Sequence, residues 1–140
     1  MNDQLPIEIN WTNLPSRREL HRKLDRLALP ADAKVLMGKL LDTTAEVAGQ
    51  IIEVGRRILA FVLDLFKRYP ATTLGAIVGL TVTMLVSSIP FIGVILGPLV
   101  GPLLAAFMIT SGAMADMRNS SIEKQIELFG AKLDAAMARA

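Results

Sequence analysis

The sequence predicts an all-α membrane protein, with a transmembrane helical hairpin flanked by amphipathic helices in the cytoplasm or at the membrane interface. The main observation is a run of 47 residues, from Tyr69 to Ala115, that contains no charged side chain. Apolar residues recur at helical spacing on both sides of this run, which predicts helices with one apolar face. Basic residues precede and follow the run and none lies at its middle, as in a hairpin whose ends share one side of a membrane.

The first unit is predicted over residues 1–30 and consists of an arm and a short basic helix. Ser16 and Glu19 have the spacing of a capping box, in which two side chains satisfy backbone N–H groups at a helix start. Leu29 precedes Pro30 and ends the helix, because a residue before proline disfavours helical backbone angles. We interpret the basic side chains of this helix first as a solvated face and second as a contact for anionic lipid headgroups. They are Arg17, Arg18, Arg22, Lys23 and Arg26, with His21 beside them.

Residues 31–69 are predicted to form one long amphipathic helix. Pro30 suits the start of a helix, and the apolar residues that follow recur at steps of three and four. Two arrangements remain open: the helix lies in the membrane interface, or it packs on neighbouring helices in a cytoplasmic bundle. We expect Ile51, Ile58 and Leu65 to form an apolar stripe that contacts another copy or subunit. If the helix lies on lipid instead, the interface is expected at the glycine faces of the hairpin.

Residues 70–115 are predicted to form the transmembrane hairpin. A helix needs about 20 apolar residues to cross a bilayer core about 30 Å thick. The uncharged run is therefore too long for one crossing and suits two. The turn is expected at residues 87–90, near the middle of the run. Pro98 and Pro102 interrupt the second arm, which we interpret as a bend rather than as a gate.

Glycine recurs at every fourth position in both arms of the hairpin. In lipid, small residues at this spacing let two helix backbones approach closely, so that van der Waals packing holds the helices together. We therefore predict helix-packing faces, within the hairpin or between subunits, at Gly75, Gly79, Gly93, Gly97 and Gly101.

Residues 116–140 are predicted to form a C-terminal amphipathic helix that begins near Ser120. Its apolar face is expected to join the oligomer interface and includes Ile126, Phe129 and Leu133. Basic and aromatic residues beside the uncharged run are expected to contact lipid headgroups, and these are Lys67, Arg68, Tyr69 and Arg118. Because both flanks are basic and the turn is bare, both termini are predicted to face the cytoplasm at a membrane of the bacterial inner-membrane type.

The composition offers little for catalysis or for cofactor binding. The chain has no cysteine and a single histidine, His21, so thiolate sites and multi-histidine metal sites are excluded. Inside the uncharged run the polar side chains are hydroxyls, whereas intramembrane proton or ion coupling uses ionisable groups. We predict no catalytic residues, no metal, no cofactor and no small-molecule substrate. The net charge of +2 does not indicate nucleic-acid binding.

These observations lead to three hypotheses of function. The first is a non-enzymatic integral membrane protein that self-associates as a structural or assembly subunit of a membrane complex. The second is a membrane-permeabilising effector. In outline the plan resembles the hydrophobic hairpin of pore-forming colicins and the compact anatomy of phage holins, although no motif assigns the chain to either family. The third is a soluble carrier that keeps the hairpin buried among its amphipathic helices.

Overall fold

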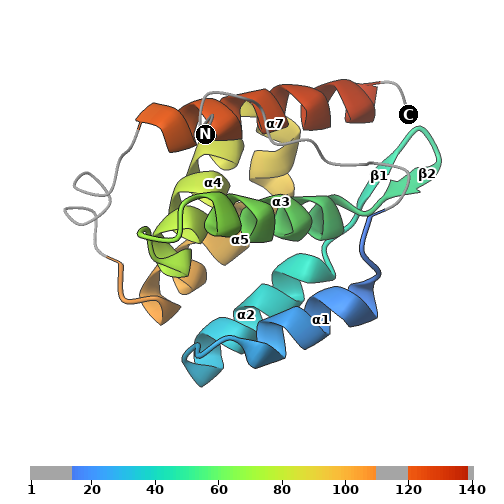
Figure 1. Cartoon of the computed structure of the whole chain (residues 1–140). Helices are drawn as coiled ribbons and strands as arrows, with labels where there is room; N and C mark the ends of the chain where they lie inside the picture. The colour runs from blue at the N-terminus through green and yellow to red at the C-terminus, as the bar shows by residue number, and fades with distance from the viewer. Residues whose placement is uncertain (1–13, 110–119, 139–140) are drawn as a thin grey trace.

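The computed structural model describes residues 14–109 and 120–138, and the protein is mostly helical over these ranges. Six helices hold 76% of the described residues, together with one two-stranded antiparallel ribbon (Figure 1). The elements are α1 (Arg17–Arg26), α2 (Ala31–Leu41), β1 (Ala45–Val47), β2 (Gln50–Ile52), α3 (Val54–Arg68), α4 (Leu74–Ser88), α5 (Pro90–Ala106) and α7 (Ser120–Ala138).

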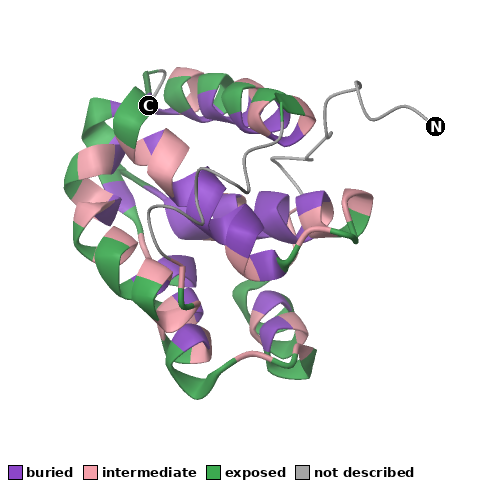
Figure 2. Cartoon of the chain, turned by 90° about the vertical axis from the view of Figure 1, so that its left-hand side faces the viewer, coloured by how far each residue is buried: buried purple, intermediate pink, exposed green. Residues whose placement is uncertain are grey.

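The helices form three layers around α4. Figure 1 shows α7 on one side, α3, α4 and α5 in the middle, and α1 and α2 on the other side. Helix α4 packs against α3, α5 and α7, and α2 packs against α1, α3 and α5. Buried residues gather in the middle of the molecule, where α3 and α4 lie (Figure 2). The core is therefore built from helices of the uncharged run together with helices on both sides of it.

The serine half of the predicted capping box is present at the start of α1. The Ser16 hydroxyl accepts a hydrogen bond from the backbone N–H of Glu19 at 3.1 Å, which satisfies one of the free donors at the helix start. Leu20 and Leu24 are buried on its inner face. Arg56 of α3 fixes the chain just before α1, because its guanidinium donates to the carbonyl oxygen of Pro15 at 2.7 Å and to that of Leu14 at 2.8 Å.

The prediction of one helix over residues 31–69 is wrong, because α2 and α3 are separate helices joined by the β1–β2 ribbon. The Thr43 hydroxyl donates to the backbone carbonyl of Lys39 at 3.0 Å, one of the local side-chain bonds that compete with a continuing helix. Ala48 and Gly49 then adopt positive φ angles of 52° and 80°. A helix does not pass through such angles, so the chain reverses there.

A glycine allows a close contact between α2 and α3. Gly55, in the first turn of α3, lies against the end of α2, and a Cβ atom there would overlap the backbone oxygen of Leu40. The backbone N–H of Gly55 donates to the carbonyl of Thr43 at 2.9 Å. Only a residue without a side chain fits at this position.

The predicted helical hairpin is present, although its arms are short. Helices α4 and α5 pack along each other, and Ile89 alone separates Ser88 from Pro90. The two arms have 15 and 17 residues, whereas a bilayer crossing needs about 20. Among the described helices, none combines the length and apolarity needed to cross a membrane. The expectation of two transmembrane arms is therefore not supported, and neither is the orientation derived from it.

The apolar stripes of the flanking helices lie in the core of the single chain. Ile58 and Leu65 of α3 are buried. The ring of Phe129 in α7 stacks on that of Phe61 at a centroid distance of 4.2 Å. Ile126 and Leu133 of α7 are buried as well. Within the single chain these side chains are covered by the packing of α3, α4 and α7 on one another, and self-association stays a prediction.

Ile51 is the exception among the predicted stripe residues. It lies on β2 opposite Glu46 and is 73% exposed. Residues 31–69 form two helices joined by a ribbon, so Ile51 lies on β2 whereas Ile58 lies on α3. The predicted stripe is therefore not continuous in the structure.

Candidate functional site

Helix α5 presents an apolar face outward, and this face is the candidate site. Its inner residues Ile92, Leu96 and Leu103 are buried. Its outer face carries exposed large apolar side chains, with Val94 80% exposed and Met108, just beyond the helix, 85% exposed. We name the α5 stripe by its residues, which are Phe91, Val94, Pro98, Pro102, Ala105 and Met108, all exposed.

The α5 stripe contains no ionisable group, because the whole of α5 is free of charge. The exposed Val35 of α2 lies beside Pro102 and Ala105 around a cavity of about 380 Å³. The exposed Asp32 of α2 lines the same cavity and marks the edge of the uncharged surface. Contiguous exposed apolar surface of this kind is typical of a binding surface for protein or lipid.

The prolines of α5 do not interrupt the helix. Helix α5 continues from Pro90 through Pro98 and Pro102 to Ala106. Each proline removes one backbone donor, and both rings lie on the exposed face. Their contribution to the site is apolar surface.

Met108 ends the stripe in an unusual backbone conformation. Its φ is 59°, a left-handed angle that usually belongs to glycine at the end of a helix. Two hydrogen bonds hold this turn: the Met108 N–H donates to Ala105 O at 2.9 Å, and the Ile109 N–H donates to Leu104 O at 2.8 Å. Such a conformation costs roughly 1–2 kcal/mol for a residue other than glycine. Met108 thus places a large exposed apolar side chain where glycine would be less strained.

The five predicted packing glycines divide into two groups. A Cβ at Gly75 would lie 2.9 Å from the ring of Phe107, and one at Gly93 would lie 3.1 Å from the carbonyl oxygen of Val86. Gly79 is buried within α4. These glycines lie at contacts inside the chain. At Gly97 and Gly101, by contrast, nothing among the described residues lies within 4 Å of an added Cβ, and packing there stays a prediction about a second copy.

The predicted headgroup residues lie beside an apolar groove of about 610 Å³. Lys67 is exposed, while Arg68 and Tyr69 are partly buried. Arg118 lies outside the described residues. The groove lies where the α1–α2 loop, the α3–α4 loop and the end of α5 meet. Its lining consists of Leu27, Ala28, Leu29, Pro30, Phe66, Pro70, Ala71, Thr72, Thr73, Leu74, Gly75, Phe107 and Met108.

The pKa of Asp64 depends on its burial and on cations of two helices near this groove. Partial burial raises the pKa of its carboxyl group, while Lys67, Lys23 and Arg68 lower it. Lys23 belongs to α1 and the other two cations belong to α3. Helices α1 and α3 pack against each other, and Leu27 and Phe66 line the same groove, so the basic last turns of the two helices come together. The sequence predicted a basic face on α1 but not this meeting with α3.

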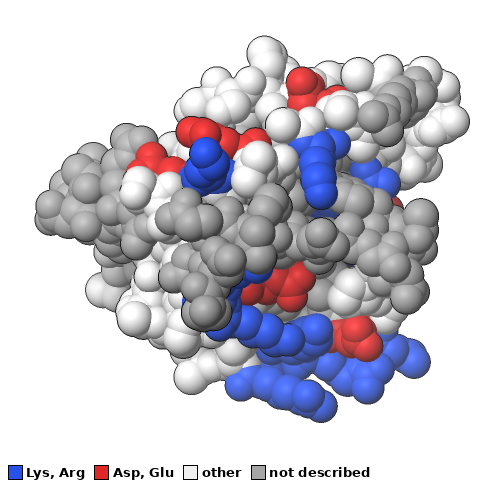
Figure 3. All heavy atoms as spheres, turned by 45° about the horizontal axis from the view of Figure 1, so that its top comes forward, with Lys and Arg blue, Asp and Glu red and all other residues white. Residues whose placement is uncertain are grey.

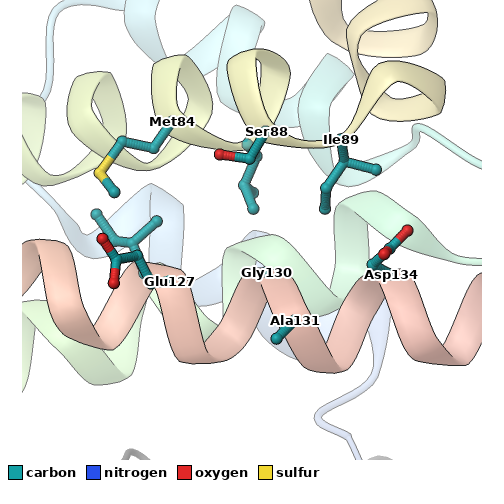
Figure 4. A pocket seen from close by; sticks show the side chains of 9 residues that line it. Met84, Ser88, Ile89, Glu127, Gly130, Ala131 and Asp134 are labelled. Atoms are coloured by element: carbon teal, nitrogen blue, oxygen red, sulfur yellow. The ribbon is translucent and has the colours of Figure 1, made fainter.

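A third cavity, of about 250 Å³, lies between the end of α4 and α7. Figure 4 shows Glu127 and Asp134 pointing from α7 towards the α4 side, where Ser88 and Ile89 lie. A nucleophilic serine needs an adjacent base within hydrogen-bond reach, and the chain's histidine lies on α1. The histidine therefore does not serve as a base for Ser88 in this cavity.

The remaining features of the described part of the chain do not point to metal chemistry. No group of three or more histidine, aspartate or glutamate side chains capable of holding a metal occurs there.

No known protein family, curated protein or solved structure matches this chain.

Proposed function

We propose that this chain is a non-enzymatic membrane-associated protein that acts as a structural or assembly subunit, with the α5 stripe resting on the bilayer. The observation that carries the proposal is the exposed, uncharged α5 stripe. Exposed apolar side chains on a helix can be buried at a membrane interface, among the upper acyl chains. The inner face of α5 stays on α4 and α2.

The energetics favour this arrangement over leaving the stripe in water. Removing apolar surface from water contributes roughly 25 cal/mol per Å². Val94 and Met108 are almost fully exposed, so both side chains gain from contact with lipid. The basic surface near the end of the stripe adds attraction to anionic headgroups, at about 1 kcal/mol for each nearby cation.

The test is flotation with lipid vesicles. Val94→Glu places a charge in the middle of the α5 stripe, and we expect it to lower the vesicle-bound fraction at least tenfold. Ile51→Glu is the matched control, because Ile51 is similarly exposed but lies on β2. The control is expected to float like the parent protein. If both variants float equally well, the α5 stripe is not the membrane-binding surface.

A second candidate function is membrane permeabilisation, and the position of α4 favours it. Helix α4 carries no charge and is covered by α3, α5 and α7. A bundle that opened on a bilayer would expose this second uncharged helix beside α5. Release of a trapped dye from vesicles would support the effector function. Flotation without dye release would support the structural role instead.

A further inference from the structure

We propose that the groove between the ends of α1, α3 and α5 binds one anionic phospholipid, with an acyl chain along its apolar lining and the headgroup at Arg26 and Lys67. The inference rests on the proposed membrane association and specifies the class of lipid recognised. Three observations carry it: the lining of the groove, the charges beside it and its position at the end of the α5 stripe.

The lining suits an acyl chain. The groove has a volume of about 610 Å³, within the range of about 300–1,000 Å³ common for small-molecule sites. Leu27, Leu29 and Phe66 supply apolar side chains from two sides, and Phe107 lies at the end of α5. The hydroxyls of Thr72 and Thr73 are the polar side-chain groups of the lining. A mostly apolar groove with few polar groups selects a chain rather than a free ion.

The charges beside the groove suit an anionic headgroup. Arg26 directly precedes Leu27 of the lining, and Lys67 directly follows Phe66; both are exposed. Lys23 of α1 acts on the same Asp64 carboxylate as Lys67 and Arg68, so cations of α1 and α3 surround one region. Figure 3 shows Lys and Arg side chains gathered along the lower edge of the molecule, where α1 lies.

Acidic groups in the same region are fewer than the cations. Asp64 is partly buried beneath them, and Asp25 and Asp32 are exposed near the α1–α2 loop. The backbone oxygen of Asp25 accepts a hydrogen bond from the Lys34 ammonium at 3.2 Å, so a further cation lies beside this loop. The balance of charge at the mouth of the groove therefore remains positive.

The position of the groove relates it to the bilayer. Met108 ends the α5 stripe and also lines the groove. A protein that rests on a membrane by the α5 stripe therefore brings the mouth of the groove to the headgroup region. This continuity indicates a bilayer phospholipid rather than a free phosphate.

The first experiment measures binding of monomeric lysolipids to the full chain by calorimetry. We expect one lyso-phosphatidylglycerol per chain, bound at least tenfold tighter than lyso-phosphatidylcholine, and no measurable binding of glycerol 3-phosphate. Equal binding of the two lysolipids would overturn the proposal, because the cations would then have no role. Glycerol 3-phosphate binding as tightly as the anionic lysolipid would overturn it too, because the acyl chain would have no role.

The second experiment compares two variants with the same change in net charge. Arg26→Gln with Lys67→Gln removes the two cations beside the groove, and we expect a loss of roughly thirtyfold in affinity for lyso-phosphatidylglycerol. Arg18→Gln with Arg22→Gln removes two exposed cations elsewhere on α1 and should change the affinity less than threefold. Equal losses in both variants would show general attraction of charge and would overturn the site.

A variant inside the groove tests whether the anionic lipid binds there. Ala71 is exposed and lines the groove, so Ala71→Glu adds a negative charge without disturbing the core, and Ala71→Gln is its control. We expect at least a tenfold loss for the glutamate variant only; no loss would overturn the site. A protein that floats with vesicles but does not distinguish the lysolipids keeps the proposed function and loses the groove. One that binds the anionic lysolipid but floats with no vesicle keeps the groove and loses the proposed function.

Discussion

Helices α4 and α5 are neighbours in sequence with the same uncharged character, yet they occupy opposite kinds of environment. Most of α4 is buried, including Ile77, Val78 and Thr81, beneath α3, α5 and α7. Only one face of α5 is buried, and its other face is the exposed α5 stripe. Apolar composition alone therefore does not tell which helix forms the core and which forms a surface.

The largest expected difference between α4 and α5 is the loss of free energy of unfolding when an apolar side chain is shortened. Ile77 of α4 is fully buried, so Ile77→Ala removes packed methyl groups and should lower the free energy of unfolding by about 2–5 kcal/mol. Val94→Ala on α5 changes an exposed side chain and should alter it by less than about 0.5 kcal/mol. Chemical denaturation of both variants measures the difference. Equal losses would mean that the exposed face of α5 is covered in solution.

Replacing a glycine by alanine is expected to change the free energy of unfolding by an intermediate amount, with opposite signs in α4 and α5. Gly75→Ala in α4 brings a methyl group against the ring of Phe107 and should cost about 1–3 kcal/mol, as overpacking does. Gly97→Ala in α5 meets open space among the described residues and should stabilise the helix by up to about 1 kcal/mol. Destabilisation by Gly97→Ala, together with a lower mass in solution, would instead reveal a second copy packed on this face.

The smallest effect concerns the end of the α5 stripe. Met108 has a left-handed φ of 59°, so Met108→Gly should raise the free energy of unfolding by about 1 kcal/mol while lowering binding to vesicles. Thermal unfolding and flotation on the same preparation would measure both changes. Loss of stability in this variant would show that the methionine side chain contributes more by packing than its conformation costs.

Local signals in the sequence were sufficient for several elements. The serine and glutamate at positions 16 and 19 predicted the start of α1, and the hydroxyl–amide bond between them is present. The turn at residues 87–90 was predicted from its composition, and α4 ends and α5 begins there. Helix α7 is described from Ser120 onward, within the segment predicted to form the C-terminal helix. These features depend on neighbours within a few residues, so periodicity and capping rules reach them.

Contacts between distant residues decided the division of residues 31–69. Two strands of three residues each are too short to leave a clear alternating pattern. The close approach of Gly55 to Leu40 depends on how α3 packs against α2. Apolar residues recur at helical spacing across the ribbon between α2 and α3, and this spacing predicted one helix. Such spacing does not reveal that the chain reverses its direction.

The sequence by itself determined which segments are apolar, which helices have one apolar face and where the charges stop. Only the tertiary structure decided what each apolar face contacts. Ile58 and Phe129 have the same kind of spacing as surface-binding residues, yet both lie in the core, while Val94 of α5 is left exposed. The hydrophobic effect is non-directional, so a stripe specifies that a partner is needed but not which one. The geometry of packing made that choice, and it also brought the ends of α1 and α3 to one groove.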